Sequence, residues 1–232
     1  MSESPILVEG ETCWRLATAN RVALLVDGAA YFRTLAAALE RAERSVVMVG
    51  WDFHSRTRLR RDEQVAPEED ELRSRLDAAA RRRSGLRIHV LGWDFAPLYA
   101  LEREALPLLR LDWQRHRRVH FRLDDQHPVG ASHHQKIAVI DDALAFCGGL
   151  DVTACRWDTP EHTARDPRRR DPGFGEYPPF HDVQMAVDGD AARSLGELVR
   201  DRWQRATGRR LRAVLPSADP WPEDLPADLE DV

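Results

Sequence analysis

The chain has 232 residues, 43% of them hydrophobic and 31% charged, and its formal net charge is −5. This length and apolar content suffice for a hydrophobic core, so one globular domain between a lead-in and a tail is expected. The acidic balance argues against a general nucleic-acid-binding surface. No stretch reaches the ~18 apolar residues of a membrane-spanning helix, and the N-terminus does not resemble a signal peptide.

The three cysteines indicate a cellular compartment. They are widely spaced and odd in number, which is typical of proteins in a reducing environment and gives no disulfide framework. We therefore expect a cytoplasmic protein whose contact with membranes, where it occurs, is peripheral.

The first half of the chain predicts strands alternating with helices. After a lead-in over residues 1–20, apolar alternation over 22–26 predicts a strand, and Asp27-Gly28 turns the chain into a helix with apolar residues three and four apart. Residues 46–51 form a short apolar run typical of a buried strand. Strand, helix and strand in about thirty residues favour a parallel or mixed sheet covered by helices.

The middle of the chain continues the same pattern. The predicted elements are a charged loop (56–70), a helix (71–83), a strand (86–93), a helical segment broken at Pro107 (97–118) and a strand (119–123). The letters GWDF occur at 50–53 and again at 92–95, which we interpret as two similar strand ends at one rim of the sheet.

The second half contains two further strands, a long loop and a terminal helix. Alternation from Lys136 to Cys147 predicts two short strands that turn at Asp141-Asp142. Residues 159–179 are rich in Pro, Arg, Asp and Gly and predict a long surface loop, here a rim over a substrate entrance. A strand (183–187) and a helix (191–206) follow, and residues 210–232 are expected to form a Pro-rich, acidic linker.

Local basic clusters occur at residues 81–83, 115–118 and 168–170. Such runs are usually solvated surfaces. The last of them follows the chemically richest stretch of the chain, so a contact with anionic lipid headgroups is the sharper hypothesis for it.

Residues 132–151 carry the side chains best suited to phosphodiester chemistry. On a strand, His134 and Lys136 point to the same face, so an imidazole and an ammonium converge where a phosphate could lie. Lys136 is also the one lysine among 34 basic residues. A compact ammonium on a flexible stem fits beside a phosphate where a planar guanidinium would crowd the histidine.

These residues resemble the signature of the phospholipase D superfamily, His-x-Lys-x4-Asp followed by x6-Gly-Gly/Ser-x-Asn/Asp. Every position is filled here, by the following residues: His134, Lys136, Asp141, Gly148, Gly149 and Asp151. Residues 156–159 and 179–183 resemble the branch of eukaryotic-type phospholipases D and their bacterial relatives. The likeness covers residues 20 to 209 and implies an α/β sandwich, one half-unit of a two-motif enzyme, with a mixed, mostly parallel sheet and helices on both faces.

The resemblance implies a mechanism in which His134 attacks phosphorus to give a phosphohistidine while Lys136 holds the non-bridging oxygens. A second histidine protonates the leaving alcohol, and neither a metal nor another cofactor is expected. Asp141 is expected to be structural, as an ion pair or a turn cap. Asp182 either fixes the tautomer of His134 or only caps the following strand.

Further substrate-binding residues follow from the same resemblance: Gln135, Gly148, Gly149, Asp151, Arg156, Trp157 and His181. Because a free carboxylate would repel a phosphodiester, Asp151 is expected to brace the loop through a neighbour such as Arg156. His133 invites a metal site with His127 or His120, but adjacent histidines on a strand face opposite ways, so we interpret His133 as a packing residue.

The sequence contains no second His-x-Lys pair. A symmetric homodimer, a missing second half, or an inactive fragment that serves as a binding module would each explain this. The Pro-rich acidic tail favours the missing half, and such a fragment would expose an apolar face. We expect hydrolysis or headgroup exchange on glycerophospholipids at a membrane surface, with a nucleic-acid-cleaving enzyme as the alternative.

Overall fold

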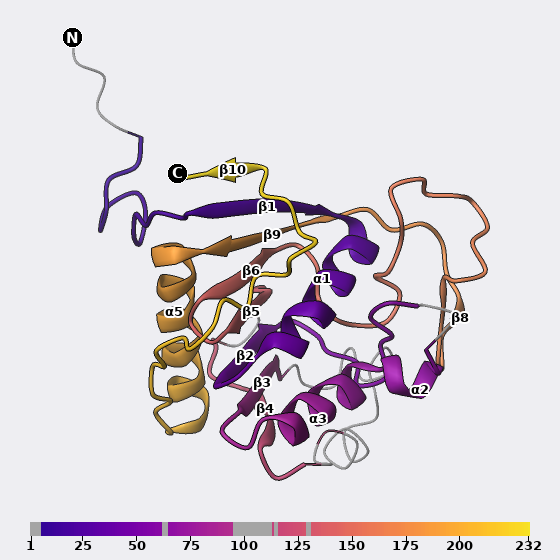
Figure 1. Ribbon diagram of the computed structural model, residues 1–232, viewed down its shortest axis with the longest axis horizontal. Coiled ribbons are helices and arrows are strands. Elements are labelled where there is room, and N and C mark those ends of the chain that lie inside the picture. The colour runs from indigo at the N-terminus through magenta and orange to yellow at the C-terminus, as the bar shows by residue number, and fades with distance from the viewer. Residues whose placement is uncertain (1–5, 62–64, 95–112, 114–115, 129–130) are drawn as a thin grey trace.

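A mixed eight-stranded sheet forms the centre of the molecule (Figure 1). The computed structural model describes residues 6–61, 65–94, 113, 116–128 and 131–232, so the helix predicted over 97–118 lies almost entirely outside the described residues. The strands of the sheet, in chain order, are β1 (Arg21–Val26), β2 (Ser45–Gly50), β3 (Arg87–Trp93), β4 (Val119–Asp124), β5 (Ile137–Ile140), β6 (Leu144–Gly148), β9 (Val183–Asp188) and β10 (Leu229–Glu230).

The spatial order of the strands is β10-β1-β9-β6-β5-β2-β3-β4. Strands β1, β2, β3, β4 and β6 run in one direction, and β5, β9 and β10 run in the other. The α/β class and the mixed sheet are therefore confirmed. Five of the eight described strands run in one direction, as a mostly parallel sheet predicts. Among the described strands, only β2–β3 and β3–β4 are parallel neighbours.

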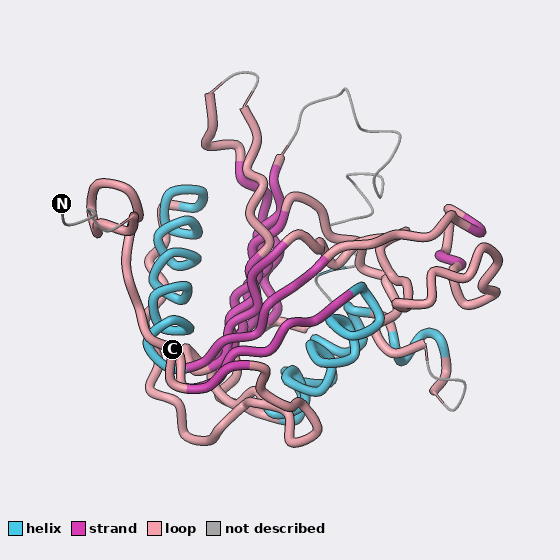
Figure 2. Tube along the Cα trace, turned by 90° about the horizontal axis from the view of Figure 1, so that it is seen from above, coloured by secondary structure: helices cyan, strands magenta, loops and turns pink. Residues whose placement is uncertain are grey.

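Helices cover both faces of this sheet (Figure 2). Helices α1 (Asp27–Arg41) and α3 (Leu72–Arg82) lie on one face, near the short α2 (Pro67–Asp70), and α5 (Gly189–Thr207) lies on the other. Phe32, Leu35 and Leu39 are buried on α1 because their spacing of three and four residues places them on one stripe. None of the described helices is long and apolar enough to span a membrane.

The two GWDF stretches do end neighbouring strands at one rim. Gly50 of β2 pairs with Gly92 of β3 in the parallel ladder, and the Trp51 and Trp93 rings lie 5.6 Å apart. The carboxyl ends of β1, β2, β3 and β6 and the amino ends of β5 and β9 share this rim, which we call the site rim.

The C-terminal segment, expected to be a linker, packs onto the domain. Trp221 is 4% exposed and joins the core on the α1 face, and Arg21 lies over its ring. Strand β10 then pairs antiparallel with β1, so the segment covers what would otherwise be an open sheet edge (Figure 1).

The packing of this segment yields a prediction about stability. Trp221→Ala should lower the free energy of unfolding by about 3 kcal/mol or more, because it empties a buried aromatic position. Trp14→Ala is the matched control, since Trp14 is 54% exposed and its loss should change stability by less than about 1 kcal/mol. Urea unfolding followed by circular dichroism measures both, and equal effects would contradict the packing role of the segment.

His89 on β3 is a buried titratable group on the α5 face. It is 9% exposed, its ring lies 4.8 Å from Trp203 and it stacks on His120 at 5.1 Å. Burial, together with the charge of His120, lowers the pKa of His89 to about 4.

A lowered histidine pKa predicts acid sensitivity. The native protein binds fewer protons than the unfolded chain here, so the stability that His89 contributes is complete above pH 6.5 and is lost as the pH falls towards about 4. The free energy of unfolding of His89→Gln should also fall as the pH is lowered over this range, but by about 3 kcal/mol less than that of the wild type. Urea unfolding at several pH values tests this, and parallel pH curves for the two proteins would refute it.

Candidate active site

His134 and Lys136 lie at the site rim, immediately before β5. The strand begins at Ile137, so both residues precede it rather than lie on it as predicted. His134 is exposed and Lys136 is 6% exposed. The Lys136 Nζ lies 6.0 Å and the His134 ring 6.3 Å from the centre of the Trp51 ring, so the imidazole and the ammonium lie beside the same indole.

Asp151 is the ion-pair partner of Lys136. The Lys136 Nζ lies 2.8 Å from the Asp151 Oδ2, and both side chains are about 5% exposed or less. The other oxygen, Oδ1, accepts hydrogen bonds from the backbone N–H groups of Trp51 at 2.9 Å and Asp52 at 3.3 Å. Burial raises the pKa of Asp151, and the Lys136 ammonium offsets only part of that effect. One carboxylate thus joins the ends of β2 and β6 to the start of β5.

Asp151 was expected to brace the loop through a neighbour such as Arg156, whereas its partner is Lys136. The Arg156 guanidinium lies over the Phe180 ring at 4.7 Å. Trp157, predicted to bind substrate, is 2% exposed and belongs to the core on the α1 face, which is a packing position.

Asp141 has the contacts of a structural cap. Its carboxylate accepts hydrogen bonds from the backbone N–H groups of Glu43, Arg44 and Ser45 at 2.7 to 2.8 Å. These bonds hold the loop between α1 and β2 against the β5–β6 turn, where Asp141 itself has a φ of 53°. The structural role expected for Asp141 matches these contacts.

The two glycines of the signature let β9 approach β6 closely. An added Cβ at Gly148 would lie 2.5 Å from the Val183 carbonyl oxygen, and one at Gly149 would overlap the Asp182 carboxylate. The Asp182 Oδ1 also accepts a hydrogen bond from the Val183 N–H at 2.7 Å. None of the hydrogen bonds among the described residues joins Asp182 to His134, so its tautomer-fixing role stays a prediction.

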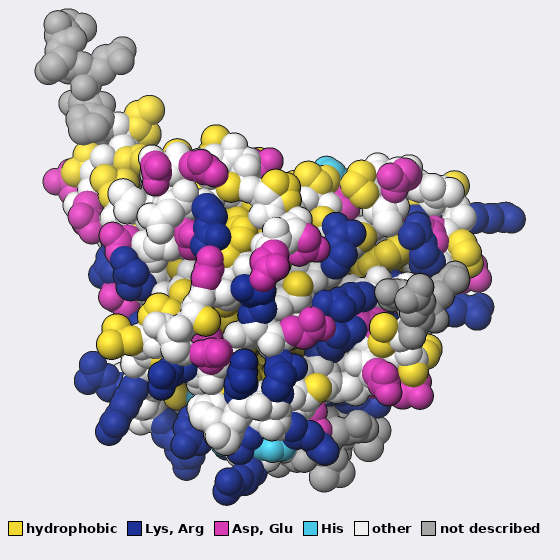
Figure 3. Space-filling view, in the orientation of Figure 1, with side chains coloured by type: hydrophobic (Ala, Val, Ile, Leu, Met, Phe, Trp, Pro, Cys, Tyr) yellow, Lys and Arg dark blue, Asp and Glu magenta, His cyan; other side chains and the backbone are white. Residues whose placement is uncertain are grey.

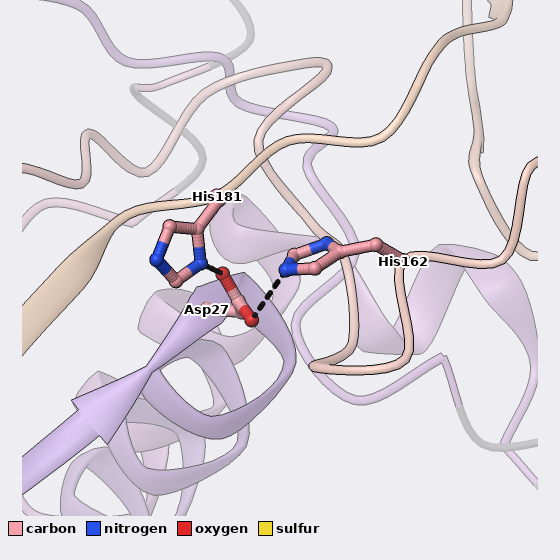
Figure 4. A group of neighbouring side chains, drawn as sticks. All are labelled: Asp27, His162 and His181. Atoms are coloured by element: carbon pink, nitrogen blue, oxygen red, sulfur yellow. Dashed lines mark hydrogen bonds and ion pairs between the residues drawn. The ribbon is translucent and has the colours of Figure 1, made fainter.

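A second group of titratable side chains lies further along the site rim (Figure 4). Asp27, at the start of α1, is fully buried; its Oδ1 accepts a hydrogen bond from His181 Nδ1 at 2.7 Å, and its Oδ2 lies 3.3 Å from His162 Nε2. The Asp182 N–H also donates to Asp27 Oδ1 at 3.2 Å. The histidine expected to bind substrate, His181, therefore contacts a carboxylate that sequence reasoning did not single out.

Asp158 holds His162 from the opposite side. It accepts hydrogen bonds from His162 Nδ1 at 3.0 Å and from the buried Arg169 Nη1 at 2.9 Å. Burial opposes ionisation of Asp158, but these two hydrogen bonds lower its pKa. The same bond to Asp158, followed by the charge of Asp27, raises the pKa of His162.

The arginines at 168–170 are paired with carboxylates, and the expected contact with anionic lipid headgroups stays a prediction. Arg169 is 1% exposed and paired with Asp158, Arg168 is paired with Asp166, and the exposed Arg170 lies 3.4 Å from Glu176. These pairs order the long loop, which includes the small β7 (Arg170–Asp171) and β8 (Gly175–Glu176) ladder.

Charges of both signs are interspersed over the face of the molecule shown in Figure 3, with Lys and Arg densest along its lower edge. The expected exclusion of nucleic acid stays a prediction.

Comparisons with known proteins agree with this arrangement. A family model described as "Phospholipase D" matches residues 113–220. Phospholipase D B of Dictyostelium discoideum is 28% identical over 213 residues, which cover 78% of this chain and 17% of that protein. Phospholipase D zeta 1 of Arabidopsis thaliana is 30% identical over 213 residues, with 78% and 19% covered. The chain belongs to the phospholipase D superfamily.

The likeness to solved structures concerns the fold alone. Phosphatidylserine synthase of Haemophilus influenzae Rd KW20 superimposes with a TM-score of 0.50 at 13% identity, over 80% of this chain and 38% of that one. This chain spans less than a fifth of the length of either of these two relatives, Phospholipase D B and Phospholipase D zeta 1.

Two residues of the site rim, Trp51 and Asp27, were not identified as site residues from the sequence. Trp51 looked like an ordinary strand end, and Asp27 looked like a turn residue before a helix. Asp27 carries one signal of its own, because it adopts a φ of 67°, which few non-glycine residues do. That signal lies in the backbone geometry and not in the sequence.

The crowding at Gly149 gives a test of the site geometry. Gly149→Ala should displace the Asp182 carboxylate and lower the free energy of unfolding by about 1–3 kcal/mol through overpacking. Gly85→Ala is the control, because an added methyl group there meets only the Glu43 carbonyl oxygen at 3.9 Å. Urea unfolding compares the two, and a tolerated alanine at position 149 would show that Asp182 does not lie against it.

Proposed function

We propose that this chain supplies one catalytic half-site of a phospholipase D-type phosphodiesterase, with His134 as the nucleophile. The observation that carries the proposal is an exposed imidazole and a buried, ion-paired ammonium beside one indole at the rim of this fold. The ammonium is held in place before substrate arrives, as electrostatic catalysis requires.

The proposed reaction has two displacements at phosphorus. The unprotonated ring nitrogen of His134 attacks, the P–O bond to the leaving alcohol breaks, and that alcohol takes a proton from a second imidazole. Water, or another alcohol, then attacks the phosphohistidine, gives its proton to the second imidazole and releases His134. Lys136 stabilises the charge on the non-bridging oxygens in both steps.

The second imidazole comes from outside the His134 half-site, from a second copy of the chain or from a companion half. An apolar strip at the site rim supports an association of this kind. Val26 pairs with Val183 in the β1–β9 ladder, and these side chains are 38% and 39% exposed, next to Leu24 at 54%. Exposed apolar side chains that adjoin one another are typical of interaction surfaces.

Glycerophospholipids are the proposed substrates, by hydrolysis or by transfer to an alcohol, at the surface of a cytoplasmic membrane leaflet. The names of the relatives support this, since both are phospholipases D. Cleavage of nucleic acid is the second candidate, because the chemistry at a phosphodiester is the same.

Phosphodiester cleavage by the purified chain tests the proposal. Short-chain phosphatidylcholine and single-stranded DNA are offered separately, with and without EDTA, to the wild type and to His134→Ala. We expect the wild type to release choline and His134→Ala to release none. A substitution at His116, on the amino side of β4, is the control and should leave the rate of choline release unchanged. Cleavage of DNA alone would assign the nuclease function, and equal lipid hydrolysis by wild type and His134→Ala would overturn the role of His134.

We further propose that Asp182 fixes the His134 tautomer, since Gly149 lets its carboxylate lie over β6 towards the segment that carries His134. Asp182→Asn should lower kcat at least about tenfold. Asp190→Asn, at an exposed carboxylate, is the control, and an unchanged kcat in Asp182→Asn would leave Asp182 with strand capping only.

A further inference from the structure

We propose that Asp27, His162 and His181 form a binding site for a divalent transition-metal ion, with Zn²⁺ as the best fit. Each residue offers one ligand atom, and the three atoms lie within 4.8 Å of one another (Figure 4). This site is separate from His134 and does not depend on the proposed reaction.

The hydrogen bonds of His162 orient it as a ligand. Its Nδ1 donates to Asp158 Oδ2, so in the neutral ring Nε2 carries a lone pair. That lone pair faces Asp27 Oδ2 at 3.3 Å, where two electron-rich atoms repel each other unless a cation or a proton lies between them. Among the described residues, this fully buried oxygen has no hydrogen-bond partner.

The residues behind the ligands match the outer shell of known metal sites. A ligating histidine usually donates its other ring N–H to a carboxylate, which is the arrangement of His162 and Asp158. Asp158 is itself held by Arg169 and by the backbone N–H groups of Thr159 and Phe180. Asp27 is held by the N–H of Asp182. Asp27 and His162 are therefore held in place before an ion arrives.

The donor set selects the ion. Two imidazoles and one carboxylate suit Zn²⁺, whereas Ca²⁺ and Mg²⁺ prefer oxygen ligands alone. The side chains of His181 and His162 are 62% and 32% exposed, so solvent can supply a fourth ligand. Binding would replace the proton on His181 Nδ1, since a ligating nitrogen must be unprotonated.

An ion at this position would join three separate parts of the chain. Asp27 begins α1, His162 belongs to the long loop, and His181 directly precedes Asp182 and β9. The ion would therefore fix the long loop to the sheet, together with Asp182, which lies against Gly149.

Zn²⁺ titration of the EDTA-dialysed full chain by calorimetry tests the site at neutral pH. We expect one tight site per chain, whose Kd rises at least about tenfold in His162→Gln and in His181→Gln and about 10–100-fold in Asp158→Asn. Co²⁺ should give the intense visible absorption of a four-coordinate site, lost in the same variants. Circular dichroism confirms that each variant is folded.

His120→Gln is the matched control, because it removes one member of a histidine pair away from the proposed site, His89 and His120, whose rings stack at 5.1 Å. It should bind Zn²⁺ as the wild type does. Three outcomes would each overturn the proposal. They are absence of tight Zn²⁺ binding in the wild type, unchanged Zn²⁺ affinity in folded His162→Gln and His181→Gln, and loss of Zn²⁺ binding in His120→Gln. No outcome depends on enzymatic activity, so failure here is distinct from failure of the proposed function.

Discussion

The ion pair between Lys136 and Asp151 is the interaction on which the site depends. Both side chains are buried, and the carboxylate also accepts hydrogen bonds from Trp51 and Asp52. Removing one member of a buried pair typically costs about 3–5 kcal/mol, because the other charge is left without a partner in a poor solvent. Substitution of either residue would therefore disturb the meeting point of β2, β5 and β6 as well as the charge proposed to hold the phosphate.

Strand direction explains why the chemically useful residues meet. Strands β1, β2 and β6 deliver their carboxyl ends to the site rim, and β5 and β9 deliver their amino ends there. Asp27, Trp51 and Asp151 follow the first set, and Lys136 and Asp182 precede the second. Residues up to 155 positions apart are thus within hydrogen-bond distance, as Asp182 and Asp27 show. The antiparallel pairing of β9 with both β1 and β6 places Asp27, His162 and His181 at the same rim of the sheet as the His-x-Lys segment.

Periodicity and motif spacing predicted most of the fold and the identity of the central pair, because these are local properties. The strand over 22–26, the helix that follows Asp27-Gly28 and the β5–β6 turn are all present. Partners were harder to predict. Arg156 was close to Asp151 in sequence, but Lys136 is close in space because β5 and β6 are antiparallel neighbours. The arginines at 168–170 were expected to form a free basic surface, whereas Asp166 pairs with Arg168 and Asp158 with Arg169. The Pro-rich tail gave no sign that Trp221 would be buried.

The paired lysine also constrains how an anionic substrate can bind. With Asp151 ionised, the pair is neutral and Lys136 has only part of its charge to offer to a phosphate. A phosphodiester monoanion beside it would bring two negative charges to one ammonium in a buried setting, which is unfavourable. Burial has already raised the pKa of Asp151, so a proton binds this carboxyl more readily than an exposed one. In the proposed reaction, proton uptake by Asp151 as substrate binds would leave the full charge of Lys136 for the phosphate, and the hydrogen bonds from Trp51 and Asp52 to Oδ1 would persist because the proton can lie on Oδ2.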